Sequence, residues 1–545
     1  MKMHKSKVLF SLLACGVLLA ACGGNKDNAN DKGSDVELGT VGEFPVTKEK
    51  IKMTMMGPGT GQAEWKDMPV FQKMAEMSNI EFEFTTPPTA DFSTKLNLAF
   101  AGDDLPDVLF GTSSDSLTPA MEMDYGSQGI LVSLEDLIDE NMPNLKKIMD
   151  EDPSIRKSIT TPDGHIYSLP MIHRGETAIW PRGPMWYRGD WLKALNVTEL
   201  PKTTDEFYDL LVRFRDEDPN GNGKKDEIPL TDVKMDSTRP WLMGAFGLTE
   251  RGIEEINGEV VYTPLTDNYK EYLTFMNKLY SEKLLDQEVY GQADEQKKAK
   301  GQNNQIGLFP DWFSIFTTGK NEKDATDDLM FQPLTSSVSP EAVVPGSTRM
   351  ARETFAITKN CPSPEAALRW VDYFYGEEGS YFLSKGPEGS LWDWAENDKG
   401  EKVRVYAEGI DVSNTEEERS RITPNYGITV PTMGYPETDD MMILTDPNQE
   451  PDRTFIEFID SETQAKITPN AKVPYPLLYL TTEESEKVRD SETDLKTYVE
   501  QMEAKFITGV EPLSNWDKYV KTIESMGVEE YVSVYQTAYD RWAEK

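Results

Sequence analysis

The chain has 545 residues, with 56 Lys and Arg against 95 Asp and Glu, which gives a formal net charge of −39. This length exceeds the size at which a single hydrophobic core stops growing, so two or more lobes are expected. The charge excludes nucleic-acid binding as the main function, because a binder must neutralise phosphates with clustered Lys and Arg. It also weighs against strongly anionic small ligands, although a local basic pocket can override the global field.

The amino terminus has the pattern of a secretion signal. A positively charged start is followed by the apolar run 8–21, which is too short for an ordinary membrane span. The run ends in Leu-Ala-Ala-Cys at Cys22, which resembles a bacterial lipobox, with 1–21 as the signal peptide and Cys22 as the lipidated new amino terminus. Ordinary secretory cleavage beside a chance cysteine is the alternative, and a second match ending at Cys15 is weaker.

Cysteine usage agrees with this prediction. The chain has three cysteines; Cys15 would leave with the signal and Cys22 would carry lipid, so Cys361 stands alone. No intrachain disulfide is therefore expected in the mature protein. Residues 22–46, rich in Gly, Asn, Asp, Lys and Ser over most of their length, are predicted to form a flexible tether.

The first part of the globular body alternates strand and helix patterns. Strands are expected over 51–55, 80–84 and 105–110, and helices over 70–77 and 93–101. Strands that alternate with helices predict an α/β lobe.

Further elements follow from residue 130. A short strand and two helices are expected over 130–145, and a hairpin over 161–170, because Asp-Gly is a strong two-residue turn signal. A strand at 185–188 leads into a helix at 191–195. Thr203 begins a capping-box pattern that starts an amphipathic helix.

The remaining chain is mostly helical by pattern. A long helix is expected over 269–280, accompanied by an apolar segment at 306–309, and a return strand at 354–357 precedes a helix over 365–375, after which the end of the chain is helical again. No internal repeat is present, and no transmembrane segment follows the signal.

An oxygen-rich stretch, 218–227, begins directly after the amphipathic helix. Side-chain oxygens at its first, third and fifth positions, a glycine at the sixth and a carbonyl at the seventh match the first half of an EF-hand calcium loop. The twelfth position, a bidentate Glu in the standard loop, is Pro229, so closure would have to come from Asp226 and Glu227. A glycine-rich turn without metal is the alternative.

Enzyme motifs are absent. With three histidines, one of them in the signal, a His-rich zinc site is implausible, and no H-E-x-x-H, C-x-x-C, P-loop or G-x-S-x-G pattern occurs. Carboxylates are so abundant that pairs at glycosidase spacing carry no information. An extracellular carbohydrate-active enzyme, a hydrolase or lyase, stays as the alternative to a binding protein.

Several stretches together support a family resemblance. The lipobox and the segments 102–108, 163–170, 191–207, 364–379 and 506–539 resemble extracellular solute-binding lipoproteins of ABC importers. The chain is similar to their large oligosaccharide-binding branch, which includes alginate- and fructo-oligosaccharide-binding proteins and the LplA-type lipoproteins. The resemblance covers nearly the whole mature chain.

The resemblance implies a structural calcium ion in the loop 218–229. Because the loops of this branch end in adjacent acids, it also answers the question of closure. The implied ligands are Asp218, Asn220, Asn222, the Lys224 carbonyl, Asp226 and Glu227.

The resemblance also implies an α/β, two-lobe, periplasmic-binding-protein-like fold of type II, with a hinge and a ligand cleft between the lobes. The expected boundaries are 47–160 with about 350–425 for the first lobe. For the second lobe they are about 161–349 with 426–545.

Sugar binding requires aromatic faces for stacking beside carboxylates, amides and Arg. For each loop-borne candidate, packing inside a lobe is the alternative. Trp180 and the stretch 311–313 stand out, because exposing a ring in such a loop needs a reason. The candidates are Glu64, Trp65, Trp180, Arg182, Tyr187, Arg188, Trp241, Asp311, Trp312, Phe313, Arg349, Arg352, Trp392 and Trp394.

The resulting hypothesis is a monomeric solute-binding protein without catalytic residues, anchored through Cys22 at the outer face of a bacterial cytoplasmic membrane. It would capture an oligosaccharide and deliver it to the transmembrane subunits of an ABC permease. The alternatives are a carbohydrate-active enzyme, or the same fold binding a peptide or another non-sugar ligand.

Overall fold

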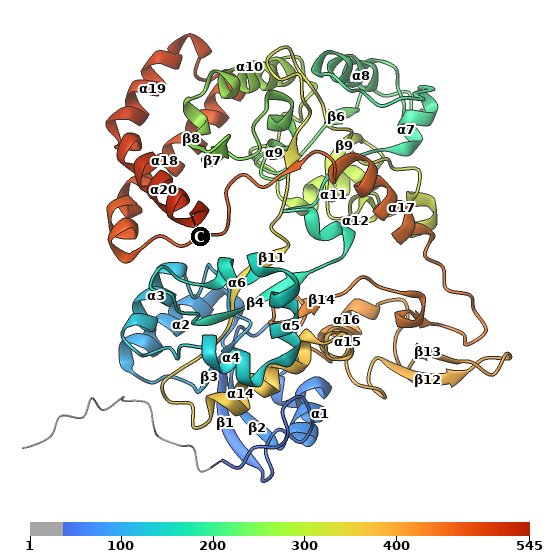
Figure 1. The fold of residues 1–545 in the computed structure, drawn as a ribbon. Coiled ribbons are helices and arrows are strands. Elements are labelled where there is room, and N and C mark those ends of the chain that lie inside the picture. The colour runs from blue at the N-terminus through green and yellow to red at the C-terminus, as the bar shows by residue number, and fades with distance from the viewer. Residues whose placement is uncertain (1–35, 545) are drawn as a thin grey trace, which may run out of the picture. The chain divides into compact units, whose positions relative to one another are not determined.

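Two large hydrophobic cores are present in the computed structural model, which describes residues 36–544 (Figure 1). One core draws on residues 46–172 and 355–433, and the other on 180–344 and 455–534. We call the corresponding parts of the chain the first and second lobes. The predicted signal peptide, Cys22 and the start of the predicted tether lie outside the described residues.

The first lobe is built on a six-stranded sheet in the order β14-β4-β11-β3-β1-β2. β1 runs parallel to β2 and β3, β14 runs parallel to β4, and β11 is antiparallel to both β3 and β4. The carboxyl ends of all strands except β11 therefore lie at one edge, where β11 begins. The strands are β1 (Ile51–Met56), β2 (Ile80–Thr85), β3 (Val108–Phe110), β4 (Ser168–His173), β11 (Met350–Ile357) and β14 (Met433–Gly434).

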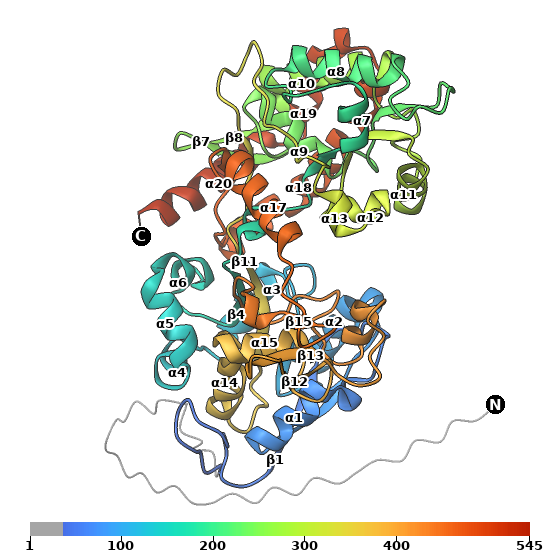
Figure 2. The ribbon, with the colours of Figure 1, turned by 90° about the vertical axis from the view of Figure 1, so that its right-hand side faces the viewer.

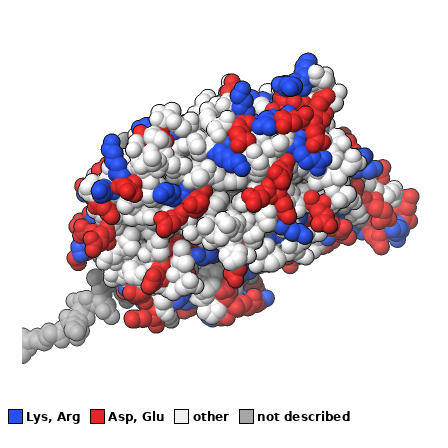
Figure 3. All heavy atoms as spheres, turned by 90° about the horizontal axis from the view of Figure 1, so that it is seen from above, with Lys and Arg blue, Asp and Glu red and all other residues white. Residues whose placement is uncertain are grey.

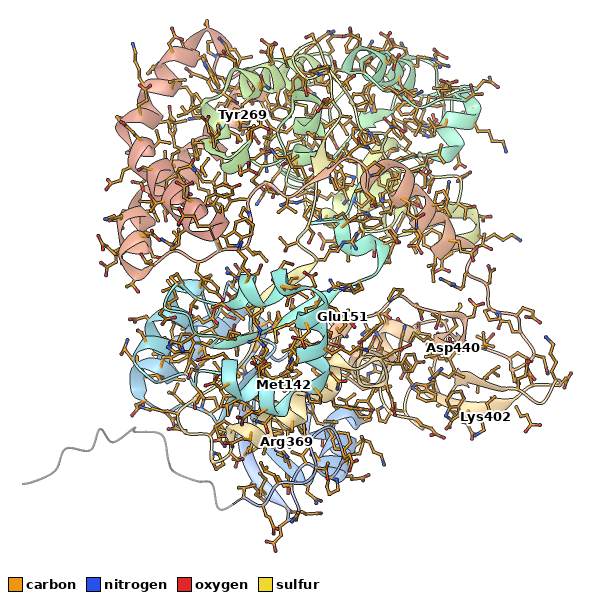
Figure 4. All side chains as sticks on the ribbon, viewed as in Figure 1. Met142, Glu151, Tyr269, Arg369, Lys402 and Asp440 are labelled. Carbon is orange, nitrogen blue, oxygen red and sulfur yellow. The ribbon has the colours of Figure 1, made fainter. Side chains whose placement is uncertain are left out.

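Successive side chains of β3 point to opposite faces of the sheet and pack in two different cores. Val108 and Phe110 join the larger core of the lobe, whereas Leu109 joins a smaller one on the opposite face. Figures 1 and 2 show helices on both faces, and Met142, labelled in Figure 4, lies in the larger core. The larger core is covered by α1 (Pro69–Ser78), α4 (Glu135–Asn141), α5 (Pro143–Glu151), α14 (Pro364–Asp372) and α15 (Glu377–Lys385), and the smaller by α2 (Thr89–Gly102) and α3 (Pro119–Ser127).

A small three-stranded sheet extends the first lobe. It consists of β12 (Trp392–Glu396), β13 (Lys402–Tyr406) and β15 (Ile443–Leu444) and has its own apolar cluster around Leu391, Trp392 and Ile422. Lys402 and Asp440 mark this region in Figure 4.

The second lobe holds the sheet β5-β9-β6 within a helical shell. Its strands are β5 (Met185–Tyr187), β6 (Ile228–Leu230) and β9 (Ile306–Pro310), with the pairs β7 (Ile253–Ile256) and β8 (Glu259–Tyr262), and β10 (Val344–Pro345) and β16 (Ala471–Lys472) beside it. Its helices are α7 (Gly189–Ala194), α8 (Thr204–Asp216), α9 (Thr238–Met243), α10 (Asp267–Ser281), α11 (Asp294–Gln302), α12 (Ser314–Thr318), α13 (Glu322–Ala325), α17 (Thr454–Glu462), α18 (Thr482–Thr508), α19 (Trp516–Ser525) and α20 (Val528–Ala543).

A buried ionic group ties three of these helices together. Glu503 on α18 accepts from Arg239 Nε on α9 at 2.7 Å and from the Tyr269 hydroxyl on α10 at 2.6 Å. Burial opposes ionisation of Glu503, but Arg239 and Arg251 hold its pKa below the ordinary value. Figure 4 labels Tyr269 among the helices of this lobe. Removing Glu503 would leave the buried guanidinium of Arg239 without its nearest carboxylate, so the group helps to fix how α18 packs.

Local patterns predicted most elements correctly. The strands expected at 51–55 and 80–84 are β1 and β2, and the α/β class is confirmed. The helix expected at 70–77 is α1, which begins at Pro69 and ends before Asn79 in the left-handed conformation.

Three expectations need correction. The segment 161–170 is no hairpin: a turn around Gly164 leads from α6 (Pro153–Ile159) into β4, which pairs with β11 and β14 instead. Because β4 and β14 belong to the first sheet, the first lobe includes 161–173 and continues through β15. Residues 36–46, placed in the tether by composition, pack on the first lobe, where Val46 is buried and Arg369 donates to the Gly39 carbonyl.

An acidic pair is buried near the start of β11. Glu353 has φ +58°, beside a bulge in the pairing with β4, and its carboxylate is fully buried. The carboxylate of Glu122 on α3 is also buried, and it accepts from the Tyr479 hydroxyl at 2.8 Å. Arg352 Nε lies 3.3 Å from Glu353 Oε1. Burial raises the pKa of Glu353 to about 8; Arg352 opposes this rise and Glu122 adds to it.

We expect Glu353→Gln to flatten the pH dependence of stability. The pKa of Glu353 is raised from 4.5 to about 8 on folding, so the folded state binds more protons within that window. The free energy of unfolding of the wild type therefore falls as pH rises from about 5 to 8, by at most about 1.4 kcal/mol per pH unit from this group. Urea unfolding at several pH values measures the slope. The exposed-site control Glu378→Gln should keep it, and an unchanged slope in Glu353→Gln would contradict the assignment.

Candidate functional site

The carboxyl edge of the first sheet gathers loops from distant parts of the chain. Gly57 follows β1, Gly111 follows β3, Arg174 follows β4 and Tyr435 follows β14. In open α/β sheets, ligands bind outside the carboxyl ends of the strands.

Two pockets lie along this edge. The first, about 350 Å³, is lined by side chains that include His173, Glu377, Tyr381, Lys385, Asn425 and Tyr435. The second, about 420 Å³, is lined by residues that include Pro58, Phe92, Ser93, Gly111 and Asp115. Ile428 and Thr429 line both, so this segment divides one edge into two adjoining pockets.

Two glycines allow the pockets to form. A Cβ on Gly111, which has φ +74°, would meet Ile428 Cδ1 at 3.0 Å. A Cβ on Gly434 would meet the His173 ring at 2.8 Å. A side chain at Gly111 would be strained by the positive φ, and one at Gly434 would require the imidazole to shift.

The first pocket contains polar groups without protein partners. Nδ1 of His173 and the hydroxyl of Tyr381 are buried and have no hydrogen-bond partner among the described residues. Burial lowers the pKa of His173, which keeps the imidazole neutral at pH 7 and able both to donate and to accept. Lys385 and Glu437 face each other at 3.7 Å. The pocket therefore offers donors and acceptors that a polar ligand can satisfy.

An exposed aromatic ring follows the carboxyl end of β9 in the second lobe. Trp312 is 50% exposed and stacks on the buried Trp180, with ring centroids 6.4 Å apart and planes at 28°. Asp311 fixes the loop, because its carbonyl accepts from Trp186 Nε1 at 2.9 Å and its carboxylate from the Thr317 hydroxyl at 2.7 Å. Trp312 is thus an open stacking face on a rigid support.

Most of the other ligand residues predicted in the second lobe are buried or partly buried within it. Tyr187, Trp241 and Arg188 are buried, and Arg188 donates to the Gly301 carbonyl. Phe313 is partly buried against Trp180, and Arg182 donates to the Asp236 carbonyl.

Among the candidates of the first lobe, Trp65 is buried and its ring lies under Gly57, whereas Glu64 beside it is exposed. The Arg349 carbonyl accepts from His173 N at 2.9 Å, which places that backbone beside the first pocket. Arg352 is buried with Glu353.

Trp392 and Trp394 flank the guanidinium of Arg404 on the small sheet. Trp392 is buried and lies 5.7 Å from the ring of Tyr381, whereas Trp394 is 38% exposed. These two rings therefore border the first pocket only through Tyr381.

The pocket residues were not found from the sequence. His173 ends β4 and Tyr435 follows β14, two strands too short or too irregular to show period-two alternation, and Glu377 and Asp115 are two of 95 acidic residues. The one available signal was position, since His173 is the last residue of a strand and Tyr435 directly follows one.

The conformation of the acidic loop after α8 is stabilised by hydrogen bonds between its own side chains and its backbone. Asp218 has φ +50° and its carboxylate accepts from Gly223 N at 3.1 Å, while Asn222 Oδ1 accepts from Lys224 N at 2.7 Å. In the described part of the chain, no group of three or more His, Cys, Asp or Glu side chains is arranged to hold a metal ion.

Individual groups of this loop nevertheless suit a hard cation. Oε1 of Glu227 is buried and has no hydrogen-bond partner among residues 36–544. Burial raises the pKa of Glu227, and the charges of Asp218 and Asp226 raise it further. Carboxylate, amide and carbonyl oxygens are the donors that calcium prefers.

Residues 59–381 match the family described as bacterial extracellular solute-binding protein. The chain belongs to this family. The family resemblance expected from the sequence motifs is thereby confirmed, as is the expectation that the protein is no enzyme. The fold is the periplasmic-binding-protein-like fold of these proteins.

Individual relatives cover almost the whole chain. The fructooligosaccharide ABC transporter substrate-binding protein FusA of Streptococcus pneumoniae is 28% identical over 99% of this chain and 98% of its own. The polygalacturonan/rhamnogalacturonan-binding protein YtcQ of Bacillus subtilis is 23% identical over 97% of each chain.

Solved structures agree with these matches. FusA in complex with kestose has a TM-score of 0.71 at 26% identity, covering 91% of this chain and 100% of that one. An EF-hand mutant of FusA in complex with fructo-nystose has a TM-score of 0.72 at 25% identity, with the same coverage. Within residues 36–544, no helix combines the length and apolar character needed to cross a membrane.

Proposed function

We propose that this solute-binding protein captures an oligosaccharide outside the cell and delivers it to an ABC-type carbohydrate importer. The observation that carries the proposal is the pair of adjoining pockets on one sheet edge, lined by hydroxyl, amide, imidazole and aromatic groups. Sugar rings bind through hydrogen bonds at their hydroxyls and stacking at their C–H faces. FusA and YtcQ, whose names specify oligosaccharide and polysaccharide ligands, support this assignment.

The two lobes would work as a clamp. The pockets lie on the first lobe and the Trp312 face on the second. We propose that ligand bound at the sheet edge is covered when the lobes close about the segments that join them. Closure would convert ligand binding into a shape that the permease recognises, and no chemical step is needed.

The lipobox supports a location at the membrane surface. We propose that Cys22 carries lipid and holds the monomeric protein at the outer face of the cytoplasmic membrane. Residues 23–35, rich in Gly, Asn, Asp and Lys, would act as a tether that allows the folded body to contact the permease.

We also propose that the loop 218–229 binds one structural calcium ion. The orphaned Glu227 Oε1 and the oxygen-rich donor set support this, as does the existence of an EF-hand mutant of FusA. Asp218, Asn220, Asn222, the Lys224 carbonyl, Asp226 and Glu227 would hold the ion, which would offset most of the charge of the three acids and fix the surface of the second lobe.

Glycan binding without turnover is the test of the main proposal. Purified protein lacking the signal is screened against a glycan panel by thermal shift, and hits are incubated for a day and analysed for products. We expect a raised melting temperature with at least one oligosaccharide and no products. Stabilisation only by peptides, or release of shorter sugars, would contradict the proposal.

Replacement of Trp312 by Ala should weaken binding of the identified oligosaccharide by about tenfold, since loss of one aromatic contact costs on the order of 1 kcal/mol. Isothermal titration calorimetry measures this change. Val510→Ala, which alters another exposed apolar side chain, serves as the control. Equal affinity of Trp312→Ala and wild type would remove this ring from the site.

Calcium removal should lower the melting temperature. At a calcium concentration 100-fold above the dissociation constant, binding stabilises the folded state by about 2.7 kcal/mol. Differential scanning fluorimetry with and without chelator measures the difference. Asp226→Asn should abolish the response, whereas Asp209→Asn, an exposed acid on the preceding helix, should retain it. A chelator without effect on the wild type would favour the metal-free turn.

A further inference from the structure

The charges that line the two pockets are unevenly distributed. Lys385 is the one Lys or Arg among the described residues lining either pocket, and it faces Glu437 at 3.7 Å. Glu377 in the first pocket and Asp115 in the second form no ion pair with any described residue. Each pocket therefore presents one uncompensated carboxylate.

Two other cationic groups near the edge already have partners. Arg174, which follows β4, lies 3.3 Å from Asp152, and Arg419 lies 2.6 Å from Glu416 while donating to the Asn425 carbonyl. Arg349 is not among the residues that line either pocket. Burial keeps His173 neutral, so the imidazole adds no positive charge.

The sizes of the pockets bear on the length of the ligand. Volumes of about 350 and 420 Å³ are each in the range of small-molecule sites. Because the pockets share Ile428 and Thr429, a ligand that fills both must pass over these two residues. A single sugar ring would occupy one pocket and leave the polar groups of the other unsatisfied.

We infer that the paired pockets select an uncharged oligosaccharide, with sugar residues on both sides of Ile428 and Thr429, and reject oligomers of uronic acids. This inference rests on the proposed carbohydrate-binding function and specifies its ligand class.

Neutral sugar hydroxyls donate hydrogen bonds to Glu377 and Asp115, and hydrogen bonds to ionised acceptors are the stronger kind. A uronate would instead bring a carboxylate beside these acids, with Lys385 already neutralised by Glu437. Repulsion between a charged ligand and a like charge in the site is one way in which a protein discriminates between ligands.

The experiment compares ligands of equal length and different charge. Neutral tetrasaccharides built from glucose, fructose, galactose, mannose or xylose are titrated beside tetramers of galacturonate, mannuronate and guluronate, by calorimetry at low and moderate salt. We expect at least one neutral tetramer to bind and every uronate to bind at least 100-fold more weakly.

Two failures can be told apart. If uronates bind as tightly as the best neutral tetramer, the inference about charge is overturned while the proposed carbohydrate-binding function stands. If no tetramer of either class binds, the proposed function fails and the inference fails with it.

Variants test whether the named carboxylates cause the selectivity. Glu377→Gln and Asp115→Asn should each weaken binding of the best neutral tetramer by about tenfold. Glu377→Lys should improve binding of galacturonate tetramer by about tenfold or more over wild type.

The matched control is Glu378→Lys, because Glu378 is the next residue in the first turn of α15 and does not line the pocket. It changes the net charge of the protein equally and should leave uronate binding at the wild-type level. Equal uronate affinity of Glu377→Lys and Glu378→Lys would overturn the role of Glu377.

Discussion

The pairing of β11 with β3 and β4 is the constraint on which the candidate site depends. Because β11 is antiparallel to both neighbours, it must begin at the edge where the other strands end. The chain therefore leaves the sheet after β4 and returns through β11 at the same edge, with residues 180–344 of the second lobe between these strands in sequence. The loops that end the remaining strands are gathered beside these crossings, and the two pockets form from them.

Two features near the start of β11 are energetically unfavourable: its backbone conformation and its buried acids. A non-glycine residue with positive φ occurs at both Arg349 and Glu353, and the Glu353 carboxylate is buried beside that of Glu122. Strained backbone and buried acids persist only where the surroundings fix them. Arg352, held between Glu353 and the ring of Tyr479, supplies part of that support. Rigid packing at this point keeps the sheet edge defined beside the loops that line the two pockets.

Sequence patterns predicted what is decided locally. Alternation identified β1 and β2, and helical spacing identified α1 and α10, because these elements show their buried faces within a few residues. The turn at Gly164 was also recognised, but its strand was assigned a neighbouring partner, since the true partner β11 follows about 180 residues later. Trp65, Tyr187 and Trp241 were predicted at the ligand site because loop aromatics resemble stacking platforms. Tertiary packing buries all three, whereas Trp312 and Trp394 stay partly exposed, each beside a buried ring.

Whole-chain charge and site charge act over different distances. The net charge of −39 is spread over the surface, and the face in Figure 3 shows acidic side chains interspersed with basic ones. In physiological salt, charges separated by more than about 8 Å are largely screened. Global acidity therefore governs solubility and non-specific contacts rather than the choice of sugar. A ligand in the proposed site would meet individual groups at hydrogen-bond distance, where screening is weak, so Glu377, Asp115 and the neutral His173 would outweigh the many other acids in determining which glycan fits.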